Sequence, residues 1–152
     1  MSTNGHEEEI HTLRVRREVE IAAPIDVSFE ALLAELGPEG EMPGGQPFPM
    51  VIEAKVGGRW FRDLGNDAGH LWGHVQVIKP PSLLEICGPL FMSYPAISHV
   101  QYRLKEEGER TLLSVLHRAM GQIPKEDREG VESGWEYNIQ RVREIAEARA
   151  QR

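Results

Sequence analysis

The chain has 152 residues, of which 40% are hydrophobic and 27% are charged, a composition typical of one globular domain and unlike that of disordered proteins. Its formal net charge of -7 at pH 7 provides no basic field for a phosphate backbone, so we expect neither nucleic acid nor an anionic membrane surface as a partner. The single cysteine, Cys87, cannot form an internal disulfide, and its apolar neighbours predict a small buried side chain.

The N-terminal residues predict a tail followed by one domain. Residues 1–11 are mostly polar and predict a flexible tail, and residues 12–152 show no boundary or repeat that would divide them. The tail contains no apolar core of a signal peptide, and no stretch approaches the roughly 18 apolar residues that a membrane helix needs. We therefore expect a cytoplasmic protein that does not contact membranes.

The first regular elements are a strand and a short helix. Apolar and charged residues alternate from Leu13 to Ala22, which predicts a half-buried strand. Pro24 then opens an apolar pattern at helical spacing, and Gly37 and Pro38 end it. Residues 37–49 are so rich in glycine and proline that they predict a surface loop, which is either a lid over a functional site or simply mobile.

Residues 50–120 have the period of two that is typical of strands. Turn signals interrupt the pattern at 57–58, 65–67, 79–81 and 106–108, which predicts about six strands. The last two runs, 97–105 and 110–119, are separated by a short acidic glycine turn and predict an antiparallel hairpin. Consecutive short strands without intervening helices indicate an antiparallel sheet.

The C-terminal segment predicts one long amphipathic helix that starts near Pro124. Its apolar residues recur at steps of three and four and include Val131, Trp135, Ile139 and Val142. Because the apolar face of the sheet is the only large surface that this stripe can cover, the fold class is α+β, with the helix packed on the sheet.

Five local patterns in this order resemble the START-like (SRPBCC) superfamily. They are APIDVSFEAL at 23–32, GGRWF at 57–61, IKPPSLL at 78–84, alternating Thr111, Leu113, Val115 and His117, and Gly134-Trp135 followed by Ile139 and Val142. The chain is most similar to the branch of homologues of the activator of heat-shock protein 90 ATPase. The resemblance implies the helix-grip fold, in which a curved antiparallel sheet of about seven strands surrounds a long C-terminal helix and leaves a hydrophobic cavity.

The same resemblance leaves the chemistry open. The superfamily's scaffold hosts lipid carriers, hormone receptors, polyketide cyclases and co-chaperone domains. The co-chaperone that gives the branch its name has a separate N-terminal domain, whereas this chain has only a short tail before its first strand. Activation of a heat-shock ATPase is therefore not the function that we expect.

The candidate ligand-binding residues are large aromatics, one inward histidine and a helix glycine. They are Trp60, Phe91, Tyr94, Tyr102, His117, Gly134 and Trp135. Ordinary core packing explains each aromatic by itself, but Gly130 and Gly134 lie on or beside the apolar stripe of the helix. A glycine inside a helix costs about 1 kcal/mol relative to alanine, so a close approach by the sheet or a ligand is the expected reason.

Metal and cofactor chemistry is not expected. Strand alternation places His70, Trp72 and His74 on the solvent face of the sheet, opposite Leu71, Val75 and Val77. His70 and His74 would then stand roughly 13 Å apart, too far to share a metal ion. No nucleophile elbow, phosphate loop or dinucleotide motif is present, and the sequence does not show whether acids such as Glu53, Asp63 and Glu85 converge.

Three functional hypotheses follow. The first is the binding of a small, largely apolar molecule between sheet and C-terminal helix, with His117, Tyr102 and Tyr94 as polar contacts. The second is a cyclase- or hydrolase-type enzyme that uses the same cavity and His117 as an acid or base. The third is a module that binds a protein partner or a second copy of the chain through the 37–49 loop or a sheet face bearing Trp72.

Overall fold

The computed structural model describes residues 7–152, so the first six residues of the expected polar tail lie outside the described part. Seven strands and two helices follow in an order that matches the sequence expectation. They are β1 (His11–Ile21), α1 (Ile25–Leu36), β2 (Val51–Ile52), β3 (Arg59–Gly65), β4 (Ala68–Lys79), β5 (Leu83–Gly88), β6 (Ala96–Glu107), β7 (Arg110–Gly121) and α2 (Lys125–Ala150).

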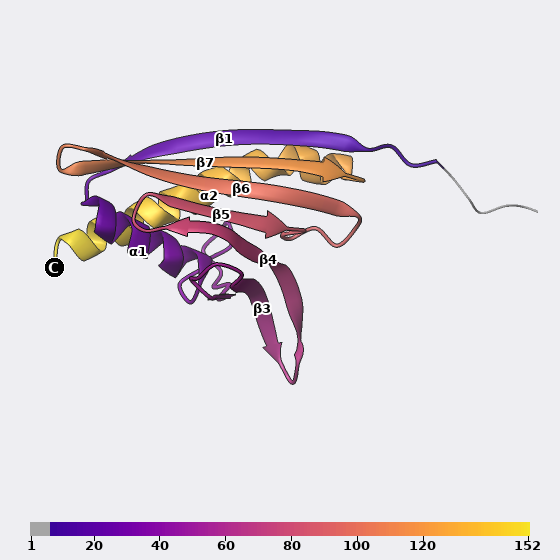
Figure 1. Ribbon diagram of the computed structural model, residues 1–152, viewed down its shortest axis with the longest axis horizontal. Helices are drawn as coiled ribbons and strands as arrows, with labels where there is room; N and C mark the ends of the chain where they lie inside the picture. The colour runs from indigo at the N-terminus through magenta and orange to yellow at the C-terminus, as the bar shows by residue number, and fades with distance from the viewer. Residues whose placement is uncertain (1–6) are drawn as a thin grey trace, which may run out of the picture.

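The seven strands form one antiparallel sheet in the order β1-β7-β6-β5-β4-β3-β2. The expected hairpin is β6 and β7, in which Glu107 pairs with Arg110 around Gly108 at a φ of 66°. β1 adds to the far side of β7, with Val15 opposite His117. Figure 1 shows the sheet curling, so that the β3–β4 hairpin bends away from the long strands toward the side that carries the helices.

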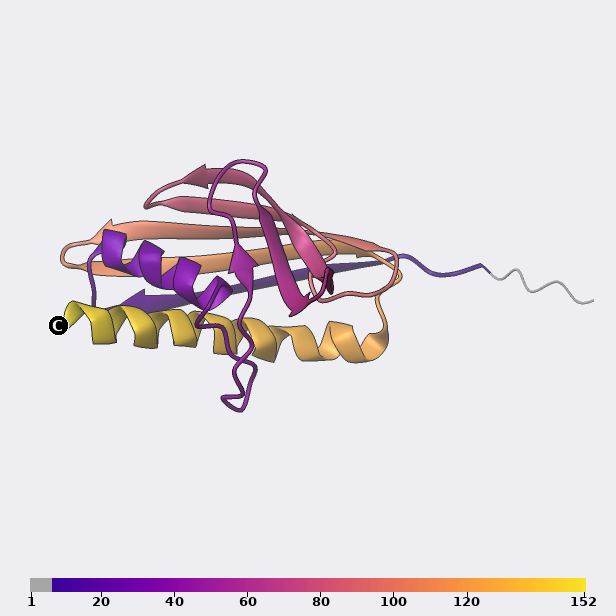
Figure 2. The same cartoon turned by 90° about the horizontal axis from the view of Figure 1, so that it is seen from below.

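α2 runs along the concave side of this sheet, with α1 beside it (Figure 2). The buried residues of α2 are Val131, Trp135, Ile139, Val142, Ile145 and Ala146, the stripe that the spacing predicts. They join one continuous core with residues of α1 and of six of the seven strands, from β1 to β7. The helix-grip fold is confirmed.

α1 ends where the cavity described below begins. Gly37 is the C-terminal cap of the helix. A larger residue does not fit at this position, because its Cβ atom would lie 2.9 Å from the carbonyl oxygen of Leu33. The indole of Trp60 on β3 donates a hydrogen bond of 2.7 Å to the carbonyl oxygen of Leu36. The chain between α1 and β2 then crosses beside α2 as an irregular loop, in which Glu41 and Pro47 form an isolated β-bridge.

The orientation of two β4 residues differs from the sequence expectation. Trp60 pairs with Gly73 and Phe61 with Leu71, so Trp72 lies in a β-bulge that reverses the alternation toward the tip of the hairpin. His70 and Trp72 therefore face the inside of the curved sheet, and Leu71 is exposed. His74 remains exposed, so the expectation that both histidines and Trp72 face solvent was correct only for His74.

The expectation of a small buried cysteine was correct only in part. Cys87 is only partly buried, and its thiol donates a hydrogen bond of 2.6 Å to Gln76 Oε1. Partial burial and the nearby Glu85 raise the pKa of the thiol. Neither helix in residues 7–152 combines the length and the apolar character that crossing a membrane requires.

Candidate functional site: a cavity between α2 and the β3–β4 hairpin

A cavity of about 600 Å³ lies between the first half of α2, the β3–β4 hairpin and the loop that follows α1. Most of its lining is apolar and comprises Leu36, Met42, Pro43, Phe48, Met50, Trp60, Trp72, Phe91, Val131 and Trp135. Met42, Pro43 and Glu126 line it and are exposed, so the cavity opens to solvent. The second half of α2 instead packs closely on the core, through residues such as Ile139 and Val142.

Aromatic rings form the wall opposite α2. Trp72 contacts Trp60 edge-on at 5.0 Å between ring centroids, and Phe48 and Phe91 lie 5.9 and 6.1 Å from it. The buried Nε1 of Trp72 has no hydrogen-bond partner among the described residues. With Trp135 on α2, all three tryptophans of the chain line the cavity.

Two glycines widen the cavity on the helix side. A Cβ atom placed on Gly130 or on Gly134 would meet no heavy atom of residues 7–152 within 4 Å. Close approach by the sheet is therefore not the reason for these glycines: the partly buried Gly134 leaves room on the helix side of the cavity, and Gly130 lines the cavity at an exposed position. A glycine weakens a helix, so its presence in α2 needs a compensating reason. The space that it leaves beside the cavity is that reason.

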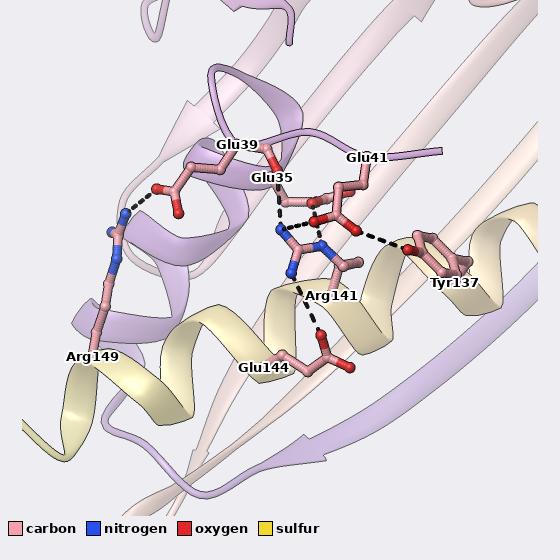
Figure 3. A network of polar contacts seen from close by, with 7 residues as sticks. All are labelled: Glu35, Glu39, Glu41, Tyr137, Arg141, Glu144 and Arg149. Carbon is pink, nitrogen blue, oxygen red and sulfur yellow. Dashed lines mark hydrogen bonds and ion pairs between the residues drawn. The ribbon is translucent and has the colours of Figure 1, made fainter. Parts of the chain in front are cut away.

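The cavity has one polar end, where α1, the following loop and α2 meet. Glu35 closes α1, Glu41 lies in the loop, and Arg141 projects from α2 between them (Figure 3). The Arg141 guanidinium approaches Glu35 Oε2 to 3.4 Å and Glu41 Oε2 to 3.3 Å. Tyr137 donates a hydrogen bond of 2.9 Å to the other Glu41 oxygen, so the loop is tied to the helix at this point.

Glu35 is the least solvated acid of this end. Its side chain is 4% exposed, and its Oε2 has no hydrogen-bond partner within residues 7–152, because the nearby Arg141 Nε is not aligned to donate to it. Burial outweighs the opposing charge of Arg141 and raises the pKa of the Glu35 carboxyl to about 8. A carboxylic acid whose pKa lies above physiological pH is thus the most buried acid among the residues that line the cavity.

The seven residues expected from the sequence fall into two groups. Trp60, Phe91, Gly134 and Trp135 line the cavity. Tyr94, Tyr102 and His117 are not part of the lining. Tyr94 donates a hydrogen bond to Asp127, and Tyr102 is fully buried and donates one of 2.8 Å to Asn138 Oδ1.

His117 lies behind the cavity wall and supports it. The Trp135 indole donates a hydrogen bond of 2.9 Å to His117 Nδ1, which leaves the proton of the neutral ring on Nε2, 2.9 Å from Ser98 Oγ. Burial lowers the pKa of His117 to about 4. His117 is therefore a neutral residue that fixes the orientation of Trp135, and it does not reach the space that a ligand would occupy.

Sequence reasoning missed Glu35 and Trp72. Glu35 follows the buried Leu32 by three positions, so helical spacing alone would have placed this acid on the inner face of α1. The glycine next to Trp72, Gly73, is the signal that could have indicated the bulge, because a glycine inside a strand often marks one. The acids that the sequence did suggest lie elsewhere: Glu53 pairs with Arg59, Asp63 is exposed, and Glu85 contacts His99 and Gln101 outside the cavity.

A second hollow, of about 520 Å³, lies between α1 and the turn at Pro80 and Pro81. Asp26, Glu30 and Pro80, which line it, are exposed. None of the buried polar side chains of residues 7–152 lines this hollow, so it offers less for specific recognition than the cavity beside α2.

A curved antiparallel sheet that grips a C-terminal helix and encloses an apolar cavity defines a START-like protein. The chain belongs to the family described as Activator of Hsp90 ATPase homolog 1-like protein, whose model matches residues 46–147. Among curated proteins, none matches the chain.

Solved structures show the same fold at low sequence identity. An uncharacterized protein from Rhizobium leguminosarum is 15% identical with a TM-score of 0.73, and the match covers 94% of this chain and 99% of that one. CalU16 from Micromonospora echinospora is 21% identical with a TM-score of 0.60, over 91% and 87% of the two chains. The di-domain ARO/CYC StfQ from the steffimycin biosynthetic pathway is 12% identical with a TM-score of 0.64, over 93% of this chain and 52% of that one.

Proposed function

We propose that this protein binds a small, largely apolar molecule in the cavity between α2 and the β3–β4 hairpin. The observation that carries the proposal is the volume of about 600 Å³ behind an aromatic wall, kept open by two helix glycines whose Cβ positions are empty. This volume is within the roughly 300–1,000 Å³ of typical ligand sites, which are mostly apolar with few polar groups.

Filling the cavity from the helix side tests the proposal. The probe is N-phenyl-1-naphthylamine, an uncharged aromatic whose own fluorescence rises in apolar surroundings, and binding is also followed through the three cavity tryptophans. We expect Gly134→Leu to weaken binding at least about tenfold, because a leucine at this position occupies the ligand's space and also favours the helix.

The matched control is Ser133→Leu, which adds the same side chain at an exposed position one residue earlier on α2. This variant should bind the probe as the wild type does. Equal binding by the wild type and Gly134→Leu, or no binding by the wild type, would contradict a ligand site in this cavity.

A second candidate is a cyclase-type reaction in the same cavity, and Glu35 is the observation that favours it. The fold likeness to the ARO/CYC protein StfQ supports this candidate, which does not require His117. In an intramolecular aldol closure, an enol carbon of the substrate would bond to a ketone carbon, and the neutral Glu35 would donate its proton to that ketone's oxygen. The enol O–H would then return a proton to Glu35, so that atoms and charge balance.

The rate of ring closure of a linear poly-β-ketone thioester tests this candidate. Because the amide of Glu35→Gln cannot transfer a proton as a carboxyl does, we expect this variant to close the ring at least about 100-fold more slowly than the wild type. Product formation is measured by chromatography. Equal rates for both proteins and for the buffer alone would exclude the reaction and leave the binding proposal standing.

A further inference from the structure

We propose that Glu35 recognises an uncharged oxygen acceptor on the ligand, so that the ligand class is an apolar ring system carrying a ketone or similar carbonyl group. The inference rests on the proposed binding function and specifies what that site selects. It starts from the position of Glu35: this residue lines the cavity, and its buried Oε2, which lies 3.4 Å from Arg141 Nε, has no hydrogen-bond partner among the described residues.

The charges around Glu35 oppose one another, and burial favours its neutral form. Arg141 from α2, Glu41 from the loop after α1 and Tyr102 from β6 are the titratable groups that influence it. Arg141 is shared, because its guanidinium also lies 3.5 Å from Glu144 Oε2. One guanidinium thus faces three carboxyl groups, and Glu35 is by far the most buried of them.

Burial decides which carboxyl keeps a proton. The Glu35 side chain is 4% exposed, whereas Glu41 and Glu144 are 27% and 67% exposed and remain solvated. Removing a charge from water is far more costly for the buried group, so the proton stays on Glu35. The raised pKa of Glu35, about 8, agrees with this geometric argument.

A neutral carboxyl has an O–H group to donate, and the one other buried donor of the lining without a partner among the described residues is the Trp72 indole N–H, in the wall opposite α2. Tyr102 is already bonded to Asn138, and Tyr137 to Glu41. A ligand carbonyl that accepts a hydrogen bond from Glu35 would pair a buried polar group. Such a hydrogen bond contributes more to the binding free energy than the same hydrogen bond to a group exposed to water. A ligand anion would meet Glu41 at the same end, and a ligand cation would contact Glu35 favourably only if Glu35 were ionised.

Matched naphthalenes test the chemistry of this end. 2-Acetylnaphthalene and 2-ethylnaphthalene share the ring and nearly the same shape, and only the first carries a carbonyl. We expect the wild type at pH 6.5 to bind the acetyl compound about three- to tenfold more tightly, the usual effect of one added hydrogen bond. Tryptophan fluorescence measures both affinities.

Variants of Glu35 locate this preference. Glu35→Leu should bind both compounds equally, and Glu35→Gln, which keeps a neutral donor, should restore the preference for the acetyl compound. In the wild type the preference should fall as the pH rises through about 8, because the ionised carboxyl no longer donates, whereas Glu35→Gln should show no such pH dependence. The pH series on wild type and Glu35→Gln decides the matter even where Glu35→Leu does not fold.

The outcomes separate this inference from the function on which it rests. Equal binding of both compounds by the wild type overturns the role of Glu35 and leaves the apolar site intact. Tighter binding of 2-(aminomethyl)naphthalene by the wild type than by Glu35→Gln at pH 6.5 overturns the inference too, because that difference requires an ionised Glu35. If none of the three compounds binds, the proposed function itself fails.

Discussion

At the scale of single residues, His117 joins the sheet to the helix. Its two ring nitrogens connect Ser98 on β6 and Trp135 on α2, and all of its neighbours at this point are buried. The ring also packs edge-on against Trp135, with the centroids 5.1 Å apart. A histidine placed in this way contributes to stability through packing and through the groups that it satisfies, and has no direct contact with a ligand.

We expect His117→Ala to lower the free energy of unfolding by about 3 kcal/mol, because it leaves a void and unpairs the Trp135 N–H and the Ser98 hydroxyl. Urea unfolding measures the loss. Met120→Ala, at an exposed position on the same strand, should cost under about 0.5 kcal/mol and serves as the control. A loss as small for His117→Ala as for Met120→Ala would contradict the structural role.

The pH dependence of stability has a definite sign at His117. Its pKa in the folded protein, about 4, lies below its ordinary value of 6.5, so the unfolded chain takes up a proton first as the pH falls. The stabilisation is present above pH 6.5 and is lost between pH 6.5 and 4. The urea series at these pH values should therefore show a smaller difference between wild type and His117→Ala at pH 4 than at pH 7.

At the scale of elements, the loop after α1 is fastened to α2. Arg141 donates a hydrogen bond of 3.1 Å to the carbonyl oxygen of Glu39 and also pairs with Glu41, and Arg149 pairs with Glu39 (Figure 3). Since Met42 and Pro43 of this loop line the cavity, its position controls how open the cavity is. The glycine and proline content of residues 37–49 left open whether this loop is a lid or simply mobile. Its contacts with α2 favour the interpretation as a lid.

We expect Arg141→Met to speed proteinase K cleavage within residues 41–47 by about threefold or more, because each partly exposed ion pair stabilises the closed loop by at most about 1 kcal/mol. Mass spectrometry locates and times the cuts. Arg143→Met is the control, since Arg143 is exposed on the same helix and pairs with Glu147 alone. Equal cleavage of the two variants would show that Arg141 does not hold the loop.

At the scale of the whole molecule, one core connects nearly all elements. The main buried cluster includes Val15 on β1, Phe29 on α1, Trp60 on β3 and Trp135 on α2. The long edge strand β1 carries exposed Arg14, Arg16, Glu18 and Glu20, side chains that discourage pairing with another sheet edge. These features suit one cooperative unit over residues 12–152, as the sequence predicts.

We therefore expect a single unfolding transition. Near-ultraviolet circular dichroism reports the tryptophans around the cavity, and the far-ultraviolet signal reports the sheet and helices throughout the chain. The two should give the same thermal midpoint, because the cavity walls share the core with both helices. An earlier near-ultraviolet transition would mean that the β3–β4 hairpin unfolds independently of the long strands.

Sequence periodicity by itself determined the order of elements, because it is a local property. The alternation in β1, the spacing of Val131, Trp135 and Ile139 on α2, and the turn between β6 and β7 each specify their element without reference to distant residues. Four of the seven candidate residues chosen from the sequence line the cavity, since large aromatics and helix glycines on inner faces have few other positions available, and the resemblance to START-like proteins implied the helix-grip fold.

Only the tertiary structure decided which polar groups reach the cavity. A bulge at Trp72 reverses the alternation toward the tip of the β3–β4 hairpin, and although Gly73 signals an irregular strand, the direction in which Trp72 turns follows only from the pairing with β3. The depth of a side chain depends on what packs in front of it, so Trp135 places His117 behind the wall, whereas the empty positions beside Gly130 and Gly134 leave the neighbouring space open. Glu35 gained its unusual character from burial and from a guanidinium shared among several acids, and both arise only when α1, the loop and α2 come together.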